Sequence, residues 1–289
     1  MTKTIAVLGA TGVYGRHLLP RLMAGGFDLR ALVRTPTAAH HAHALGADVR
    51  AADTFDEASL VKALTGCDVA INLATALRDD GSGSDYAGND RVRREGVPIF
   101  VSACEKAGVG RIVQQSIALV HAAGADWADE DTLTHPTANP VAEAANASAR
   151  AMEDAVMRGS ADWLILRGGL FYGPGTTFDD GWFAAARAGK LRLPGDGSDY
   201  VSLVQIADMA AATVAAVARD VSNTALIIAD DAPAQWRDVF GFIAASIGAP
   251  APQPGGRLGF PSWRVRNTRA CAALDWAPVY ADYRAGLTR

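Results

Sequence analysis

The chain has 289 residues, of which 49% are hydrophobic and 20% are charged, and its formal net charge is −4. This length can bury a large core, either as one α/β domain or as two joined lobes. The small negative charge argues against nucleic acid or an anionic membrane as the main partner. Cys67, Cys104 and Cys271 are widely spaced and form no C-x-x-C pair, which is typical of reduced thiols in a cytoplasmic protein.

A glycine-rich turn follows the first predicted strand, residues 4–8, and leads directly into a helical pattern. Gly9 permits a tight turn off the strand, Gly12 lets backbone approach a pyrophosphate, and Gly15 lets the helix pack against the strand. The N-terminus of the helix adds backbone N–H groups and a positive dipole end. We therefore predict a dinucleotide-binding turn made of Gly9, Thr11, Gly12, Val13, Tyr14 and Gly15.

The residue that ends the second predicted strand, 28–33, indicates which dinucleotide is bound. An acidic residue there would bind the adenosine ribose hydroxyls of NAD(H), whereas an arginine would pair with the 2′-phosphate of NADP(H). The chain has Arg34 at this point, and Arg16 in the first helical turn can reach the same place. The sequence thus favours NADP(H) over NAD(H).

The next strands are predicted at residues 48–51 and 68–73, with a helix over 58–64 between them. The residues that follow these strands are expected to border the adenine and the middle of the cofactor. A short helix over residues 37–45 carries His40, His41 and His43, but these do not share one helix face, so no metal site is expected. The additional cofactor contacts predicted here are Asp53, Thr54, Leu73, Ala74 and Thr75.

A long helix is predicted from about residue 89 to residue 107, where Gly108 ends it. Its charged side chains are expected to form a solvated face. A fifth strand, 111–115, ends at Ser116, and a functional loop of roughly twenty residues follows. Asn139 caps the next helix, and a sixth strand covers residues 162–166. The charged residues of the solvated face are Arg91, Arg93, Arg94 and Glu95.

Strands and helices alternate up to the sixth strand, which indicates a doubly wound parallel sheet of the Rossmann type. The remainder is less regular, with short strands, helices over 207–218 and 235–247, and a Pro- and Gly-rich connection. We expect a dinucleotide-binding domain at 1–168 and a smaller C-terminal substrate-binding lobe. The lobe consists of 169–203 and 230–289, and residues 204–229 are expected to pack back onto the first domain.

Several motifs beyond the first turn carry a family resemblance. They are Ala-Gly-Val-Gly-Arg-Ile-Val at 107–113, Tyr-Gly-Pro-Gly at 172–175, Gly-Asp-Gly at 195–197, and the segments 204–210 and 274–278. With these motifs the chain resembles the extended short-chain dehydrogenase/reductases, which include sugar-nucleotide epimerases and dehydratases. The resemblance runs from end to end. It implies the same fold, a nicotinamide cofactor, a small-molecule substrate, a possible homodimer through two long helices, and cofactor contacts at Gly168 and Gly169.

The resemblance breaks at the catalytic residues of that family. The family uses a Tyr and a Lys four residues apart on the helix after the fifth strand, and a Ser or Thr at the end of that strand. These positions fall on Ala145, Ala149 and Ile117, and nowhere in the chain does a Tyr stand four residues before a Lys. A less characterised branch of bacterial epimerase/dehydratase-like proteins is similar here and also lacks the pair.

Other groups must therefore donate the proton, or the reaction must need none at the hydride step. His121 follows the strand end most closely, and Tyr172 and Ser116 are further candidates. Ser116 is also expected to contact the cofactor. Acids of the long loop and His135 are alternatives, although the three acids are expected to form a solvated turn: Asp129, Glu130 and Asp131. Aromatic residues expected to contact the substrate are Trp127, Phe178, Trp182 and Tyr200.

Three functions remain open on the sequence. The first is an NADP(H)-dependent oxidoreductase of atypical mechanism that acts on a small or secondary-metabolite carbonyl or enone. The second is a non-redox isomerase, cyclase or dehydratase that has reused the same cleft. The third is a regulatory protein that binds NADP without turnover. Oxidation of NADPH during turnover separates the first from the other two.

Overall fold

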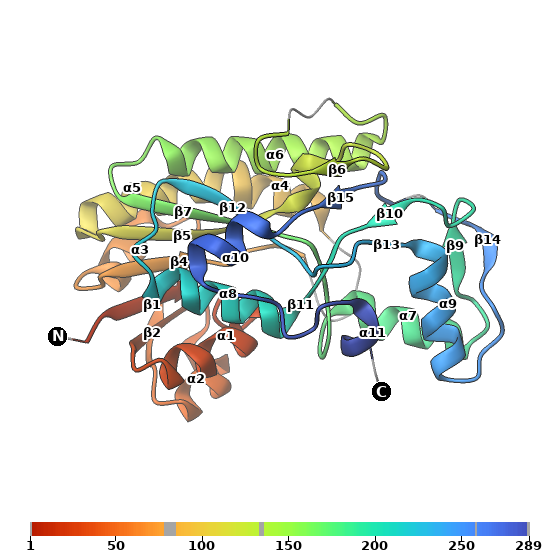
Figure 1. Ribbon diagram of the computed structural model, residues 1–289. Helices are drawn as coiled ribbons and strands as arrows, with labels where there is room; N and C mark the ends of the chain where they lie inside the picture. The colour runs from red at the N-terminus through yellow and green to blue at the C-terminus, as the bar shows by residue number, and fades with distance from the viewer. Residues whose placement is uncertain (1, 78–84, 133–135, 258, 288–289) are drawn as a thin grey trace. The chain divides into compact units, whose positions relative to one another are not determined.

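The computed structural model describes residues 2–77, 85–132, 136–257 and 259–287 (Figure 1). His135, one of the alternative proton donors, lies outside this part of the chain. The described chain divides into two compact units. Unit 1 consists of Met1–Ser116, Ala147–Leu166 and Ala210–Ala225, and unit 2 consists of Ile117–Asn146, Arg167–Met209 and Leu226–Arg289.

Within the described residues, a seven-stranded sheet has the order β12-β7-β5-β4-β1-β2-β3. The pairs formed by β1 with β2 and β4, by β2 with β3, and by β4 with β5 are parallel. This order reverses direction between β1 and β4, which is the point where Rossmann-type sheets bind dinucleotides. The strands are β1 (Thr4–Leu8), β2 (Asp28–Val33), β3 (Asp48–Ala51), β4 (Val69–Asn72), β5 (Arg111–Ile117), β7 (Asp162–Gly168) and β12 (Thr224–Ile228).

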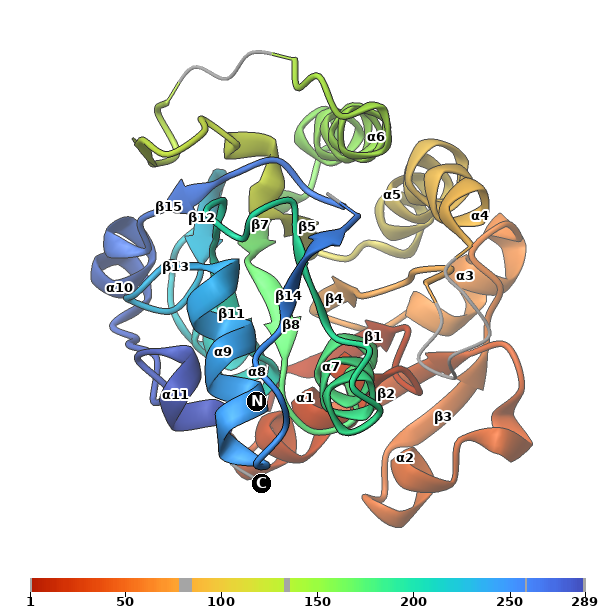
Figure 2. The same ribbon diagram turned by 90° about the vertical axis from the view of Figure 1, so that its right-hand side faces the viewer.

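Apolar side chains on one face of this sheet build one hydrophobic cluster of unit 1. Leu8, Leu32 and Ile165 of the strands pack with Leu60 and Phe100 of the covering helices, and all of them are almost fully buried. Figure 2 shows α3, α5 and α6 on this face. The helices with residues in unit 1 are α1 (Val13–Ala24), α2 (His40–Ala44), α3 (Glu57–Leu64), α4 (Tyr86–Arg91), α5 (Val97–Ala107), α6 (Pro140–Met157) and α8 (Ile206–Ala218).

The long helix predicted over residues 89–107 is interrupted. A π-helical turn, Val92–Gly96, separates α4 from α5. Pro98 lies in the first turn of α5 and has no N–H to bond to a preceding carbonyl, so the regular pattern cannot run through it. As predicted, α5 ends at Gly108, which adopts φ 73°, and Asn139 Oδ1 accepts from the N–H of Ala142 at the start of α6 (3.1 Å).

Unit 2 is built from short strands around an aromatic core. In the described chain it contains the strand pairs β10-β13, β11-β8, β14-β9 and β15-β6. The strands are β6 (Trp127–Ala128), β8 (Leu170–Tyr172), β9 (Arg192–Pro194), β10 (Tyr200–Val201), β11 (Leu203–Gln205), β13 (Ala234–Gln235), β14 (Gln253–Gly256) and β15 (Arg264–Val265). Its other helices are α7 (Thr177–Arg187), α9 (Trp236–Ser246), α10 (Thr268–Leu274) and α11 (Tyr283–Gly286).

Candidate dinucleotide and substrate sites

The glycines after β1 differ in what surrounds them. Gly9 has φ +84°, and a Cβ there would lie 2.9 Å from the backbone of Leu73 at the end of β4. At Gly15 a Cβ would lie 2.3 Å from the carbonyl oxygen of Ala10, so only glycine allows α1 to approach the turn this closely. At Gly12 a Cβ would meet only the carbonyl oxygen of Gly9, at 3.4 Å. Gly12 therefore leaves open space beside the start of the helix.

The start of α1 fits a phosphate group. Gly12 is the N-cap residue, it supplies no side-chain cap, and the first turn carries no acidic residue. Helix N-termini of this kind attract anions through their dipole and backbone N–H groups. The side chain of Tyr14 takes no part in this surface, because its hydroxyl is bonded to Thr213 and burial raises its pKa above the usual value.

Two arginines stand near the expected position of the adenosine ribose. Arg34 follows β2, is exposed, and makes no ion pair or side-chain hydrogen bond within the described residues. Arg16 is also exposed, and its Nη1 donates to the carbonyl of Thr11 at 3.4 Å. Asp53 accepts from the N–H of Phe55 at 2.8 Å, which fixes the turn that contains Thr54. The turn after β1 is thus suited to a dinucleotide, and the side chains of both arginines are exposed beside it.

Buried amides organise the turn after β4. Nδ2 of Asn72 donates to Oε1 of Gln114 on β5 at 3.0 Å, and Oδ1 of Asn72 accepts from the N–H of Ala74. The hydroxyl of Thr75 donates to Oδ1 of Asn89 at 2.7 Å. The backbone over 73–75 is therefore held in place by hydrogen bonds to neighbouring elements.

Ser116 lies at the end of β5 and is fully buried. Its hydroxyl donates to Oε1 of Glu153 on α6 at 2.6 Å. Arg93 from the π-helical turn also enters this region, where its Nη1 donates to the hydroxyl of Ser148 at 3.3 Å. Burial lowers the pKa of the Arg93 guanidinium, while the carboxylates of Asp90 and Glu153 act in the opposite direction.

The prediction of a solvated face is therefore wrong for Arg93. The signal that could have placed it is helical spacing, because Arg93 shares a helix face with Asn89, Gly96 and Phe100, which are all buried. Arg91 and Arg94 do lie on the exposed side, where they pair with Glu95 and Asp90.

The positions that the resemblance assigns to the family's Tyr and Lys, Ala145 and Ala149, lie one turn apart on α6. Ala145 is partly exposed, whereas Ala149 is fully buried. An alanine methyl group can neither donate a proton nor carry charge, so neither position can take the family's role.

His121 closes a short helical turn after β5 and is 5% exposed. Nη1 of Arg167 lies 2.8 Å from its Nε2. An arginine has only donors, so Nε2 must accept, and in this arrangement the imidazole is neutral with its proton on Nδ1. Nε2 could donate a proton only after this contact is lost and Nε2 itself carries the proton.

The acidic turn predicted near His121 is only partly solvated. Asp131 is exposed, and Asp129 accepts from the hydroxyl of Thr132 at 2.8 Å. The side chain of Glu130 is instead 4% exposed and accepts from the N–H of Ile227 at 2.8 Å. It follows that Glu130 is a structural residue that ties this turn to β12.

Tyr172 and the glycines before it are packed inside unit 2. Tyr172 is 0% exposed, its hydroxyl donates to the carbonyl of Asp282 at 3.3 Å, and burial is the first cause that raises its pKa. A Cβ at Gly168 would lie 2.5 Å from the ring of Phe171, and one at Gly169 would lie 2.9 Å from the carbonyl of Ser202. Close packing by itself thus accounts for glycine at both positions.

The four aromatic residues predicted to contact substrate fall into two clusters. Phe178 and Trp182 have ring centroids 5.8 Å apart, and Phe260 packs edge-on against Phe178. Trp127 and Tyr200 instead lie on either side of the Arg264 guanidinium, whose central carbon is 4.4 Å and 4.2 Å from the two ring centroids. The sequence offers Arg264 only as one of six arginines of the C-terminal part that could grip a diphosphate, and nothing in it distinguishes Arg264 from the other five.

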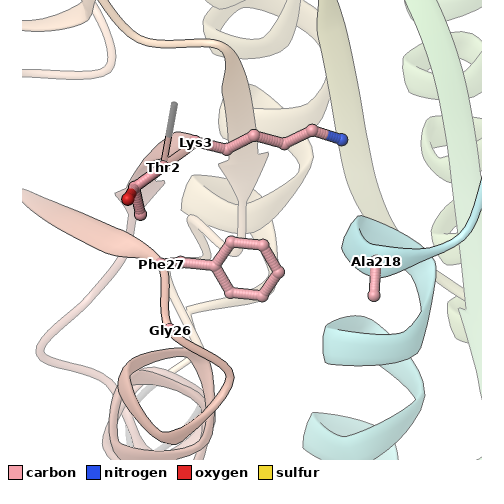
Figure 3. A pocket seen from close by; sticks show the side chains of 5 residues that line it. All are labelled: Thr2, Lys3, Gly26, Phe27 and Ala218. Carbon is pink, nitrogen blue, oxygen red and sulfur yellow. The ribbon is translucent and has the colours of Figure 1, made fainter.

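Unit 1 also has a pocket that is not lined by the residues of the glycine turn. Figure 3 shows its lining residues, Thr2, Lys3, Gly26, Phe27 and Ala218, with the Phe27 ring turned toward Ala218. Lys3 and Phe27 directly precede β1 and β2, so this pocket is at the amino ends of the strands. The glycine turn is at the carboxyl ends, and the pocket is not the dinucleotide site.

No helix in the described part of the chain is long and apolar enough to cross a membrane. The strand order and the glycine turn together define a Rossmann-type dinucleotide-binding protein. The sequence model of the NAD(P)H-binding family matches residues 9–220. The chain therefore belongs to the NAD(P)H-binding family, and the expected similarity to short-chain dehydrogenase/reductases is confirmed at the level of fold.

Relatives and solved structures agree with this assignment. The chain is 34% identical to a 3-diazoavenalumate denitrifying reductase from a Streptomyces species, over 99% of both chains. It is 27% identical to a 2-alkyl-3-oxoalkanoate reductase from Stenotrophomonas maltophilia, over 85% of this chain and 76% of that one. A structure of UDP-glucuronic acid 4-epimerase from Bacillus cereus superimposes with a TM-score of 0.80 at 20% identity, covering 98% and 96% of the two chains.

Proposed function

We propose that this protein is an NADPH-dependent reductase that removes an aromatic diazo group as dinitrogen. The observation that carries the proposal is the similarity to the denitrifying reductase along the whole chain, combined with Ala145 and Ala149 at the positions of the family's Tyr and Lys. The first supplies a reaction type, and the second restricts the chemistry to steps that need no positioned tyrosine.

Hydride transfer to a diazonium group meets this restriction. The bound cofactor would supply hydride to the terminal nitrogen of Ar–N₂⁺, forming the neutral diazene Ar–N=N–H. The carbon–nitrogen bond then breaks, N₂ leaves, and the proton ends on the ring carbon. The balance is Ar–N₂⁺ plus NADPH giving Ar–H, N₂ and NADP⁺. No alkoxide forms, so no side chain has to protonate one during hydride transfer.

The protein's own part is to bind and orient the two reactants. The open side of Gly12 and the uncapped start of α1 would hold the pyrophosphate, with the backbone over 73–75 along the middle of the cofactor. Arg34 and Arg16 would pair with the 2′-phosphate, which is the basis for proposing NADPH rather than NADH. The Ser116–Glu153 pair would keep the end of β5 rigid rather than donate a proton.

The test is turnover of an aromatic diazonium compound by the purified protein with NADPH. We expect one NADPH oxidised per N₂ released. When NADPH is deuterated on only one face of the nicotinamide, the cofactor should lose the deuterium for one labelled face and keep it for the other. The facial selectivity separates catalysis from spontaneous reduction in solution. Loss of N₂ without NADPH oxidation, or label transfer from both faces, would refute the proposal.

A carbonyl substrate is the second candidate, favoured by the similarity to the 2-alkyl-3-oxoalkanoate reductase. Here the hydride step creates an alkoxide that needs a proton, and His121 would have to supply it after leaving Arg167. His121→Ala therefore separates the two candidates. It should lower carbonyl reduction by about 100-fold or more but leave diazonium reduction within about twofold, since that chemistry needs no donor.

A further inference from the structure

Two arginines of unit 2 lie against one exposed indole ring. The central guanidinium carbons of Arg264 and Arg266 are 4.4 Å and 4.8 Å from the ring centroid of Trp127. The pairing of β15 with β6 explains this, because Arg264 is in register with Trp127. Tyr200 covers Arg264 at 4.2 Å. The result is a cationic aromatic stack of Trp127, Tyr200, Arg264 and Arg266.

The positive charge of this stack is not neutralised within the described residues, where neither Arg264 nor Arg266 forms an ion pair. Glu130 and Asp131, which follow Trp127 in the chain, pair with Arg269 and not with the arginines of the stack. Two guanidinium groups that share one ring repel each other, and a bound anion would relieve this repulsion.

The geometry of the stack also suits a planar ligand. Trp127 is 38% exposed although it is large and apolar. Arg264 holds the rings in position, because it lies between Trp127 and Tyr200 and its Nη1 donates to the carbonyl of Ala125 at 3.2 Å. Arg266 is exposed and presents donors that match a carboxylate in a bidentate geometry.

We propose that the cationic aromatic stack binds an aromatic carboxylate, with the ring of the ligand against Trp127 and its carboxylate on Arg266. The binding of an aromatic carboxylate is inferred from the stack alone. That this ligand is also the substrate rests on the proposed function, which the inference deepens. Under it, the diazo substrate is an aromatic acid, in agreement with the carboxylate that the name diazoavenalumate denotes for the relative.

Calorimetric titration with 4-hydroxycinnamate, in the absence of NADPH, tests the stack independently of turnover. The neutral amide of the same acid and UDP serve as comparison ligands. We expect the carboxylate to bind about 10- to 100-fold more tightly than the amide. Equal binding of acid and amide, or tighter binding of UDP than of the acid, would overturn the proposal.

Variants identify the residues responsible. Arg266→Gln should abolish the preference for acid over amide. Trp127→Ala should weaken the binding of both ligands. Arg257→Gln is the matched control, since Arg257 is an exposed arginine of unit 2 with no place in the stack. An unchanged preference in Arg266→Gln, with the melting temperature retained, contradicts the proposal. Failure of diazonium turnover with acid binding intact would reject the proposed reaction and leave the binding site standing.

Discussion

The carboxyl ends of β1 and β2 differ in kind from those of β5 and β12. After β1 and β2 stand open glycine backbone, an uncapped helix and the exposed Arg34. After β5 and β12 stand buried polar groups, the Ser116–Glu153 pair and the carboxyl of Asp230. The first pair of strand ends has kept what binds a dinucleotide. The second pair of strand ends carries polar side chains that face inward, so the groups suited to a dinucleotide and the buried polar groups stand at different strand ends.

The largest loss of stability and of cofactor binding is expected at Gly15, where α1 packs against the glycine turn. Gly15→Ala would put a Cβ 2.3 Å from the carbonyl of Ala10 and must displace α1. We expect a loss of about 1–3 kcal/mol of stability or more, together with loss of NADPH binding, measured by denaturant unfolding and by calorimetry. Gly12→Ala is the matched control: its Cβ has room, so stability should stay within about 0.5 kcal/mol while NADPH binding weakens. If Gly12→Ala leaves cofactor affinity unchanged, the turn is not the phosphate site.

The choice of cofactor depends on one exposed side chain. Arg34→Glu replaces a cation next to the expected 2′-phosphate by an anion. Since a charge-assisted hydrogen bond contributes about 1.5–3 kcal/mol, the affinity for NADPH should fall by about 10- to 100-fold, and that for NADH should change little. Dissociation constants for both cofactors measure this. An equal change for both would remove Arg34 from the phosphate site.

The buried pair at β5 is expected to matter for stability rather than for catalysis. Ser116→Ala removes the donor to Glu153 and leaves a buried carboxylate short of one partner. The free energy of unfolding should fall by about 1–3 kcal/mol, while the diazonium turnover number stays within about twofold. Ser198→Ala, in a half-buried turn of unit 2 where the hydroxyl of Ser198 donates to Asp196, serves as the control. A loss of turnover that exceeds the loss of folded protein would return Ser116 to the catalytic candidates.

The smallest effect concerns pH and the end of β12. Burial raises the pKa of Asp230 well above its usual value, and the carboxylates of Asp231, Asp282 and Asp208 add to this. A raised folded-state pKa means that the stabilising contribution is complete below the unfolded-state pKa and is lost as pH rises through the folded-state value. In Asp230→Asn the side-chain oxygen can still accept from the N–H of Ala232, but the side chain no longer titrates. The melting temperature of the variant should therefore fall less than that of the wild type as pH rises above about 4, the ordinary pKa of an aspartate; parallel pH profiles would contradict this.

Strand and helix positions in the first half of the chain followed from local sequence. The strand predicted at residues 28–33 coincides with β2, and the turn of Gly9, Gly12 and Gly15 has the three distinct surroundings that its motif requires. Such features are local, because hydrophobic alternation and glycine spacing act over a few residues. Interruptions of a helix that depend on a single residue were harder to predict, as Pro98 and the π-helical turn illustrate.

The sequence by itself determined the Rossmann-type sheet, the glycine turn and the absence of a Tyr-x-x-x-Lys pair, because each is written in contiguous residues or in their spacing. Only the tertiary structure decided that Arg93 is half-buried and donates to Ser148, that Ser116 is bonded to Glu153, and that Arg264 lies between Trp127 and Tyr200. These contacts join residues that are 37 to 137 positions apart, and no local pattern encodes which distant side chains meet. The proposed cofactor site was therefore visible in the sequence, whereas the cationic aromatic stack was not.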